Sequence, residues 1–461
     1  MFITRIEITN IKAFKDKVVL DLNHNRSGIE KDIKLGRIKE IDSTLFTPII
    51  SIVGANAKGK TTIIEALNNF FLMSSFSPIF LPSDHEFLEI LNKYYKPIPL
   101  IDNSLLDSIF SVFTKYQTTG QAVINDDEIN NIYEFIKIDD DTATLDKTYS
   151  FINDIYLLMV NKKIQKWNSL KRVKDEQSSI KVSFHDIQLG DFSVLLSDIN
   201  TNQIWDFSFF DENNNLIVDI KNHLNKFKEY RDKVYCFNNK NVPWQIRTFD
   251  HILIDDDKYK SDLSKNPNFS LVELANSLGK ELTLNIIKLT DSKIREIIFE
   301  KNESGSLSKV FKIVNLDGST IFANELSVGT KRFLQLVCWF QQITKQKQGL
   351  ILIDEFDWSL HISLIDFFKN YIFSLNNDFN IQLIFTSHNP IVSTKLLSNK
   401  QVYLIQEFED EVWIDKLSKL VNGNNSVLKL FIENKIGSRP SQYDIDNVLM
   451  KLSIINDKKI K

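Results

Sequence analysis

The chain has 461 residues, and its 43% hydrophobic and 25% charged residues are ordinary for a folded protein with a large core. Its 13 glycines and 9 prolines are fewer than average usage gives, which excludes collagen-like and low-complexity classes. The net charge of −4 lacks the basic excess of proteins that coat nucleic acid.

The cysteine and hydropathy patterns indicate a cytoplasmic protein without membrane contact. Cys236 and Cys338 lie far apart without CxxC spacing, which argues against a disulfide framework and a zinc site. No apolar run approaches the ~18 residues of a membrane span. The first residues alternate apolar and polar side chains, as in a strand and unlike a signal peptide.

The N-terminal segment predicts strands followed by one helix. Residues 2–9 and 18–22 read as two strands around a turn, and residues 23–47 as a polar loop. Residues 47–53 form a short apolar run, which is typical of a strand buried inside a parallel sheet. A helical period begins at Thr61.

The middle of the chain carries weaker signals. We expect helices at 105–116, 130–138 and 149–170, and strands at 181–184, 207–210 and 216–220. No heptad repeat is sustained, so a long coiled-coil arm is not expected.

The C-terminal part again alternates strands with helices. Strands are expected at 295–300, 309–314, 349–353 and 381–385, and a helix follows Ser327. This alternation predicts an α/β fold with a mostly parallel sheet. Residues 1–75 and 295–461 are expected to form one α/β unit, called the head below, with an inserted helical and β region at 76–294.

The strongest motif is Gly-Ala-Asn-Ala-Lys-Gly-Lys-Thr at 54–61, which matches the phosphate-binding pattern G-x-x-x-x-G-K-S/T. Its glycines let the backbone turn closely around an anion, and the following helix presents its N-terminal N–H groups. Lys60 is expected to reach the phosphates of ATP, and the Thr61 hydroxyl to ligate Mg²⁺. We expect nucleotide contacts from Gly54, Asn56, Ala57, Lys58, Gly59, Lys60, Thr61 and Thr62.

A second motif is the apolar run 350–353 that ends in Asp354 and Glu355. A strand ending in aspartate can deliver a carboxylate to the Mg²⁺ shell. Glu355 can then polarise the water that attacks the γ-phosphate. Alone, such a run is common; together with the loop at 54–61 it indicates a P-loop NTPase.

Two further motifs narrow the class. Glu-Leu-Ser-Val-Gly-Thr-Lys at 325–331 opens a helix, with Ser327 as an N-cap residue. It resembles the Leu-Ser-x-Gly signature of ABC-type ATPases, which implies that Ser327 and Gly329 of one subunit contact the γ-phosphate held by another. His388, in a Ser-His-Asn-Pro stretch, resembles the family's switch histidine, and residues 358–361 resemble its D-loop.

The order of these motifs resembles the SMC-like, RecF/OLD-like branch of ABC-type ATPases. Residues 8–14 resemble the opening strand and turn of that branch, and Asn56 fits its phosphate loop. Residues 433–440 resemble the end of ATPases from phage-defence and abortive-infection operons. The signature reads Leu-Ser-Val-Gly-Thr where ABC proteins usually have Leu-Ser-Gly-Gly-Gln. For the Mg²⁺-sensing glutamine, Gln188 and Gln121 both stay open.

The resemblance implies an ATP-hydrolysing sensor or switch in bacterial anti-phage defence that works as an ATP-sandwiched dimer or higher even oligomer. A separate effector is expected, such as a TOPRIM nuclease, as in the PARIS system, or an HNH nuclease, as in Septu. One alternative is a DNA-repair ATPase of the RecF/SMC type, which the missing basic excess disfavours. Another is a transporter-coupling ATPase, which the long insertion disfavours.

Overall fold

The computed structural model describes both ends of the expected head and parts of the middle of the chain. The described residues are 2–24, 26–41, 44–54, 58–73, 165, 167–186, 190–197, 206–217, 226–227, 230, 234–237, 267–301, 305–346, 348–361, 363–365, 367–368, 371, 380–408, 411–421 and 427–432.

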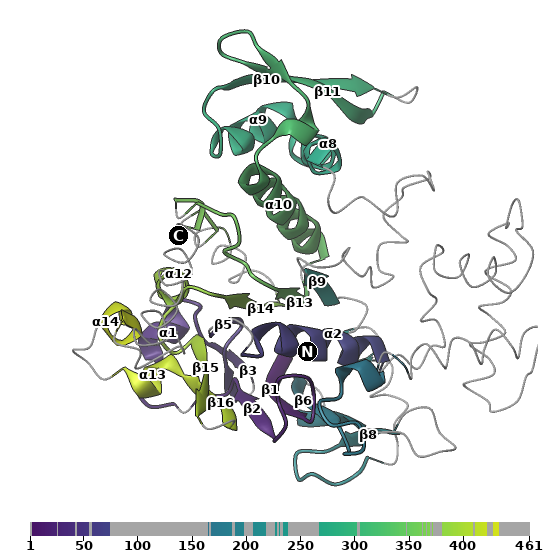
Figure 1. Cartoon of the computed structure of the whole chain (residues 1–461), viewed down its shortest axis with the longest axis vertical. Coiled ribbons are helices and arrows are strands. Elements are labelled where there is room, and N and C mark those ends of the chain that lie inside the picture. The colour runs from purple at the N-terminus through teal and green to yellow at the C-terminus, as the bar shows by residue number, and fades with distance from the viewer. Residues whose placement is uncertain are drawn as a thin grey trace, which may run out of the picture.

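A six-stranded sheet runs through the molecule in the order β16-β15-β5-β14-β13-β9 (Figure 1). Five neighbouring strands are parallel, and β16 pairs antiparallel with β15 at one edge. The strands are β5 (Ile49–Val53), β9 (Val234–Phe237), β13 (Gln348–Ile353), β14 (Asn380–Ser387), β15 (Val402–Phe408) and β16 (Glu411–Lys416). The sheet confirms the predicted α/β fold.

The central strands are buried on both faces. In β5, Ile50 and Ile52 point into one hydrophobic cluster, whereas Ile49 and Val53 point into the other. Successive side chains of a strand face opposite sides, so an all-apolar run is required where both sides are covered. This explains why the sequence run 49–53 contains almost no polar residues.

On one side, helix α2 (Lys60–Met73) packs among strands of both sheets, and their apolar side chains form a single cluster. The second sheet is antiparallel, with the order β2-β1-β6-β7-β8. Gln382 of β14 connects the sheets, because its buried amide exchanges two 2.8 Å hydrogen bonds with the backbone of Ile3. The strands are β1 (Phe2–Thr9), β2 (Val18–Asp21), β6 (Ser179–Asp186), β7 (Gly190–Ser197) and β8 (Asp206–Phe210).

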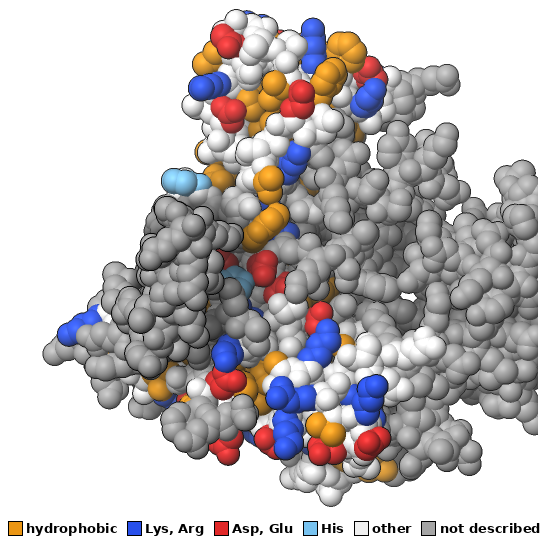
Figure 2. Space-filling model, in the orientation of Figure 1, with side chains coloured by type: hydrophobic (Ala, Val, Ile, Leu, Met, Phe, Trp, Pro, Cys, Tyr) orange, Lys and Arg blue, Asp and Glu red, His pale blue; other side chains and the backbone are white. Residues whose placement is uncertain are grey.

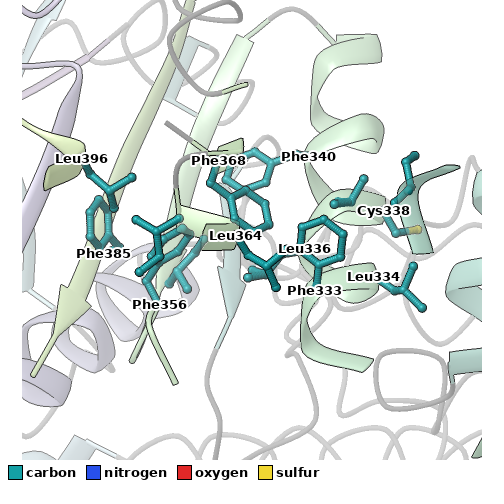
Figure 3. Packing of buried hydrophobic residues seen from close by; sticks show 14 of the residues in the cluster. Phe333, Leu334, Leu336, Cys338, Phe340, Phe356, Leu364, Phe368, Phe385 and Leu396 are labelled. Atoms are coloured by element: carbon teal, nitrogen blue, oxygen red, sulfur yellow. The ribbon is translucent and has the colours of Figure 1, made fainter. Parts of the chain in front are cut away.

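On the other side, helix α10 (Val328–Gln346) contributes to a cluster of interlocking phenylalanine rings. Figure 3 shows Phe333 and Phe340 of α10 beside Phe368, with Phe356 and Phe385 closer to the sheet. The lobe above α10 in Figure 1 consists of two helices and a small antiparallel sheet. Its elements are α8 (Pro267–Leu278), α9 (Lys280–Lys288), β10 (Ile294–Lys301), β11 (Leu307–Asn315) and β12 (Thr320–Ile321).

Short elements complete the described part of the chain. They are α1 (Glu30–Lys34), β3 (Lys39–Ile41), β4 (Thr44–Phe46), the 3₁₀ helix η3 (Ala323–Glu325), α12 (Pro390–Leu396), α13 (Leu417–Leu420) and α14 (Val427–Ile432). No described helix is both long enough and apolar enough to cross a membrane.

Most expected strands and helices are present, with several differences. The expected loop at 23–47 contains α1, β3 and β4. Of the strand expected at 216–220, the described residues 216–217 include one isolated bridge at Leu216, and 218–220 lie outside the described residues. The helices expected at 105–116 and 130–138 lie outside the described residues, as does most of the helix expected at 149–170, of which 165 and 167–170 are described and helical. Strands β6 and β9 fall within 76–294 but pair with β1 and β13, so the sheets extend beyond the expected head boundaries.

Candidate functional site

The phosphate-loop motif joins the end of β5 to the start of α2, as its sequence context requires. Asn56 and Ala57 lie outside the described residues. Gly54 packs closely against β15, and a Cβ atom there would lie 3.2 Å from the Cβ of Ile405. The loop is thus held between the sheet and the helix N-terminus, where backbone N–H groups can bind an anion.

Gly59 is the residue at which the N-terminal turn contacts the phosphate loop. Its φ is +100°, a conformation that favours glycine, and a Cβ atom would lie 2.7 Å from Phe14 Cζ. Phe14 itself is fully buried. The turn at 8–14 therefore braces the loop from outside through the Phe14 ring.

We expect Gly59→Ala to lower the free energy of unfolding by about 2–4 kcal/mol, from positive-φ strain and overlap with Phe14. ATP binding should weaken as well, because the loop must move. Gly318→Ala is the matched control, since Gly318 also has a positive φ but nothing lies within 4 Å of its Cβ position. Denaturant unfolding and ATP titration measure both effects; identical behaviour of the two variants would contradict the bracing role of Phe14.

Lys60 points back across the loop. Its ammonium donates a 2.6 Å hydrogen bond to the carbonyl oxygen of Gly54, and the side chain is almost fully buried. Burial lowers the pKa of Lys60 to about 8, although the nearby carboxylates of Asp354, Glu355 and Asp357 act in the opposite direction. This geometry places a cation where the loop would enclose phosphate groups.

The other expected loop contacts differ in environment. Lys58 forms an ion pair with Glu407 of β15, so its charge already has a carboxylate partner. Thr62 lies in the first turn of α2 and is buried.

The carboxylate of Asp354 is the centre of a hydrogen-bond network that joins the ends of β13 and β14 to the start of α2. The Thr61 hydroxyl donates to Asp354 Oδ2 at 3.0 Å, and the Thr386 hydroxyl donates to Oδ1 at 2.6 Å. Burial raises the pKa of Asp354, whereas these hydrogen bonds lower it. The motifs at 54–61 and 350–355 are thereby in contact through side chains.

Glu355 faces His388 across this network. Its carboxylate Oε1 lies 3.2 Å from Nε2 of His388, and its backbone N–H donates to Thr386 Oγ1 at 2.7 Å. Glu355 also has a φ of +52°, a strained conformation for a residue with a side chain. The surrounding hydrogen bonds therefore hold the carboxylate in a position that the backbone alone disfavours.

Arg332 is a site residue that the sequence motifs did not reveal. It lies in the second turn of α10, is 5% exposed, and donates from Nη2 to the carbonyl oxygen of Asp354 at 3.3 Å. Burial lowers its pKa to about 10, while Asp354 and Glu355 favour its charge. A buried guanidinium thus links the helix after the signature to the acidic strand end.

Ser327 caps helix α10, as expected from its sequence position. Its Oγ accepts the backbone N–H of Thr330 at 3.1 Å. Gly329 is required by close packing, because a Cβ atom there would lie 2.5 Å from the carbonyl oxygen of Ser359. Within one chain, Ser327 thus contacts Thr330, and Gly329 contacts Ser359.

The ligand donors suit a Mg²⁺ ion that is bound together with a nucleotide. Thr61 and Asp354 supply one hydroxyl and one carboxylate side by side. Mg²⁺ is usually held by one or two protein oxygens together with phosphates and water.

A comparison with models of known protein families identifies the family of this chain. A family model described as "AAA ATPase domain" matches residues 1–392. The chain belongs to the AAA ATPase domain family. As a member of this family the protein is an ATPase, and the network around Thr61 and Asp354 lies within the matched residues.

Solved structures similar to this AAA ATPase domain protein include SMC heads. The SMC head domain from Thermotoga maritima is 12% identical with a TM-score of 0.38, covering 90% of this chain and 99% of that one. An SMC head bound to the C-terminal winged-helix domain of ScpA is 13% identical with a TM-score of 0.40, covering 91% of this chain and 99% of that one. A third structure is an SMC head domain with an extended coiled coil, bound to the C-terminal domain of ScpA derived from Pyrococcus furiosus. It is 10% identical with a TM-score of 0.41, covering 94% of this chain and 99% of that one. No curated protein matches this sequence.

Proposed function

We propose that this ATPase hydrolyses ATP at sites shared by two copies of the chain and acts as a nucleotide-controlled switch in bacterial anti-phage defence. Each site would use the loop, acidic and histidine motifs of one copy and the signature of the other. Its residues would be Lys60, Thr61, Asp354, Glu355 and His388 on one side and Ser327 and Gly329 on the other.

The hydrogen-bond network around Asp354 carries the catalytic part of this proposal. It brings Thr61, Asp354, Glu355 and His388 together from three separate segments. Thr61 and Asp354 would hold Mg²⁺, which would neutralise charge on the phosphates. Glu355 would orient and polarise the attacking water, and His388 would hold the Glu355 carboxylate on its exposed side.

The surroundings of the signature support a shared site. Ser327 contacts Thr330 of α10 and Gly329 contacts Ser359, while Val328 between them is 53% exposed and Trp358 is 48% exposed. Contiguous exposed apolar patches mark contact surfaces, and these two side chains would contribute to such a patch if the partner chain packs here. Figure 2 shows acidic side chains gathered at the centre of this face, below the lobe of α8 to β11.

Ser327→Arg is expected to abolish ATP-driven pairing while leaving ATP binding to the single chain nearly unchanged. The long cation would occupy the space into which the partner's nucleotide must fit. Because the change also removes an N-cap, which costs about 1 kcal/mol, Ser327→Ala is the control for cap loss and should pair better than Ser327→Arg. Analytical ultracentrifugation with ATP, beside nucleotide titration, measures both properties. Normal pairing by Ser327→Arg would contradict the shared site.

The defence role rests on the sequence resemblance of residues 433–440 and the Leu-Ser-Val-Gly-Thr signature. The ATP state would control the binding or release of a separate effector, with a TOPRIM or HNH nuclease as the candidate class. Co-purification of the chain with the products of neighbouring genes, with and without ATP, tests this role. Nucleotide-dependent binding of a nuclease would support it; no such partner together with salt-sensitive DNA binding would favour the DNA-repair alternative.

A further inference from the structure

A partly buried hydrogen bond joins the end of β14 to the loop that follows the neighbouring strand β13. Ser387, the last residue of β14, donates its hydroxyl proton to Asp357 Oδ2 at 2.9 Å. Ser387 is completely buried, and its Oγ also accepts the backbone N–H of Asn389 at 3.0 Å. Burial raises the pKa of the Asp357 carboxyl, and the hydrogen bond from Ser387 lowers it.

This hydrogen bond lies directly behind His388. The His388 side chain is 40% exposed, and its Nε2 lies 3.2 Å from Glu355 Oε1. The backbone of His388 also hydrogen-bonds to Asp357. A half-exposed imidazole has few packing contacts to fix it, so its position depends on how the backbone beneath it is held.

The same aspartate also starts the turn that reaches the signature. The backbone N–H of Leu360 donates to the carbonyl oxygen of Asp357 at 3.3 Å. Within this turn the carbonyl oxygen of Ser359 packs against Gly329, leaving no room for a side chain there. Asp357 therefore contacts Ser387, next to His388, through its side chain, and its carbonyl oxygen begins the turn that packs against the signature segment.

We propose that Asp357 is a positioning residue: through Ser387 it fixes the loop that carries His388, and so aligns His388 with Glu355 for hydrolysis. The inference rests on the proposed ATP hydrolysis at this site. Asp357 would act on catalysis without touching the nucleotide. It would affect the rate of the chemical step and leave the binding of ATP to the phosphate loop unchanged.

The test is a double-mutant cycle read as kcat and KM for ATP. Asp357→Ala and Ser387→Ala should each lower kcat about tenfold, the kind of loss that follows from a misplaced reacting group, with KM nearly unchanged. The double variant should lose no more than either single variant, because all three remove the same contact. Asp357→Asn can still accept the Ser387 hydrogen bond and should recover most of the rate.

Asp317→Ala is the matched control. Asp317 accepts a comparable hydrogen bond from the Ser319 hydroxyl at 2.6 Å, in the turn between β11 and β12, so its loss should leave kcat unchanged. Thermal unfolding of each variant identifies global destabilisation; if Asp357→Ala unfolds, Ser387→Ala, which removes one hydroxyl, carries the test.

Each outcome decides the inference. Additive losses in the double variant, or wild-type kcat in both single variants, would overturn the positioning role while leaving ATP hydrolysis in place. A wild-type chain that does not hydrolyse ATP would overturn the proposed function as well.

Discussion

ATP binding is expected to weaken by about 10–100-fold when Lys60 is replaced by alanine, because a hydrogen bond to a charged group contributes about 1.5–3 kcal/mol. The fold should survive. The Lys60 ammonium donates its hydrogen bond to the backbone carbonyl of Gly54, in a buried site that disfavours the lysine's charge. Removing the lysine side chain therefore does not leave a buried carboxylate without its hydrogen bonds. Calorimetric titration with ATP and Mg²⁺ measures the loss.

Lys58→Ala is the matched control for this change. Lys58 lies two positions earlier in the same loop but is paired with Glu407, so its removal should weaken ATP binding much less. Equal losses of ATP affinity in the two variants would show that ATP binding responds to the loss of any charge in the loop. Undiminished binding by Lys60→Ala would show that the loop does not hold the phosphates as described.

Hydrolysis is expected to fall by ~10²-fold or more in Glu355→Gln, the scale at which a general base usually acts. Glutamine keeps the size and hydrogen-bonding capacity of the side chain but cannot take the proton of the attacking water. ATP should still bind, because Lys60, Thr61 and Asp354 are unchanged. Phosphate release under single-turnover conditions measures the rate, and size-exclusion chromatography should show the paired, ATP-filled form accumulating.

Glu300→Gln, a similar exchange on the exposed strand β10, should hydrolyse ATP at the wild-type rate. Hydrolysis by Glu355→Gln at the wild-type rate would mean that Glu355 only solvates the end of β13. The catalytic role would then move to another group, such as His388. In the defence setting, an accumulated ATP-bound pair should hold the effector in one signalling state.

The parts of the site that are fixed by local geometry could be predicted from the sequence. A loop around a phosphate requires glycines, a lysine and a hydroxyl at fixed spacing, so residues 54–61 could be recognised without the fold. The run at 350–355 could be predicted in the same way, because the apolar strand and the acidic residues at its end form one short segment of sequence. In both cases the residues that act together are neighbours in the chain.

The residues that connect these segments could not be predicted in this way. Thr386, Arg332 and Asp357 contact partners 22 to 32 residues away, across the ends of strands whose neighbours in the sheet were unknown. A threonine or arginine at such a distance has no characteristic spacing. Their roles depend on sheet order, which determines which strand ends meet.

The missed elements have a related cause. Strand β9 has four residues and β3 has three, too few to show a period. In the charged segment 23–47, α1 has five residues and displays no apolar stripe. These elements are stabilised by pairing and packing with distant segments, which local propensity does not encode.

The most direct measurement of the shared-site claim is ATP hydrolysis by a mixture of Lys60→Ala and Ser327→Arg chains. Each variant alone should be inactive, because every site in its pairs carries a lesion. In a mixed pair, one site carries both lesions and the other carries neither, so part of the activity should return on mixing. Native mass spectrometry establishes that mixed pairs form; mixed pairs that form and remain inactive would contradict the claim that two chains share each ATP site.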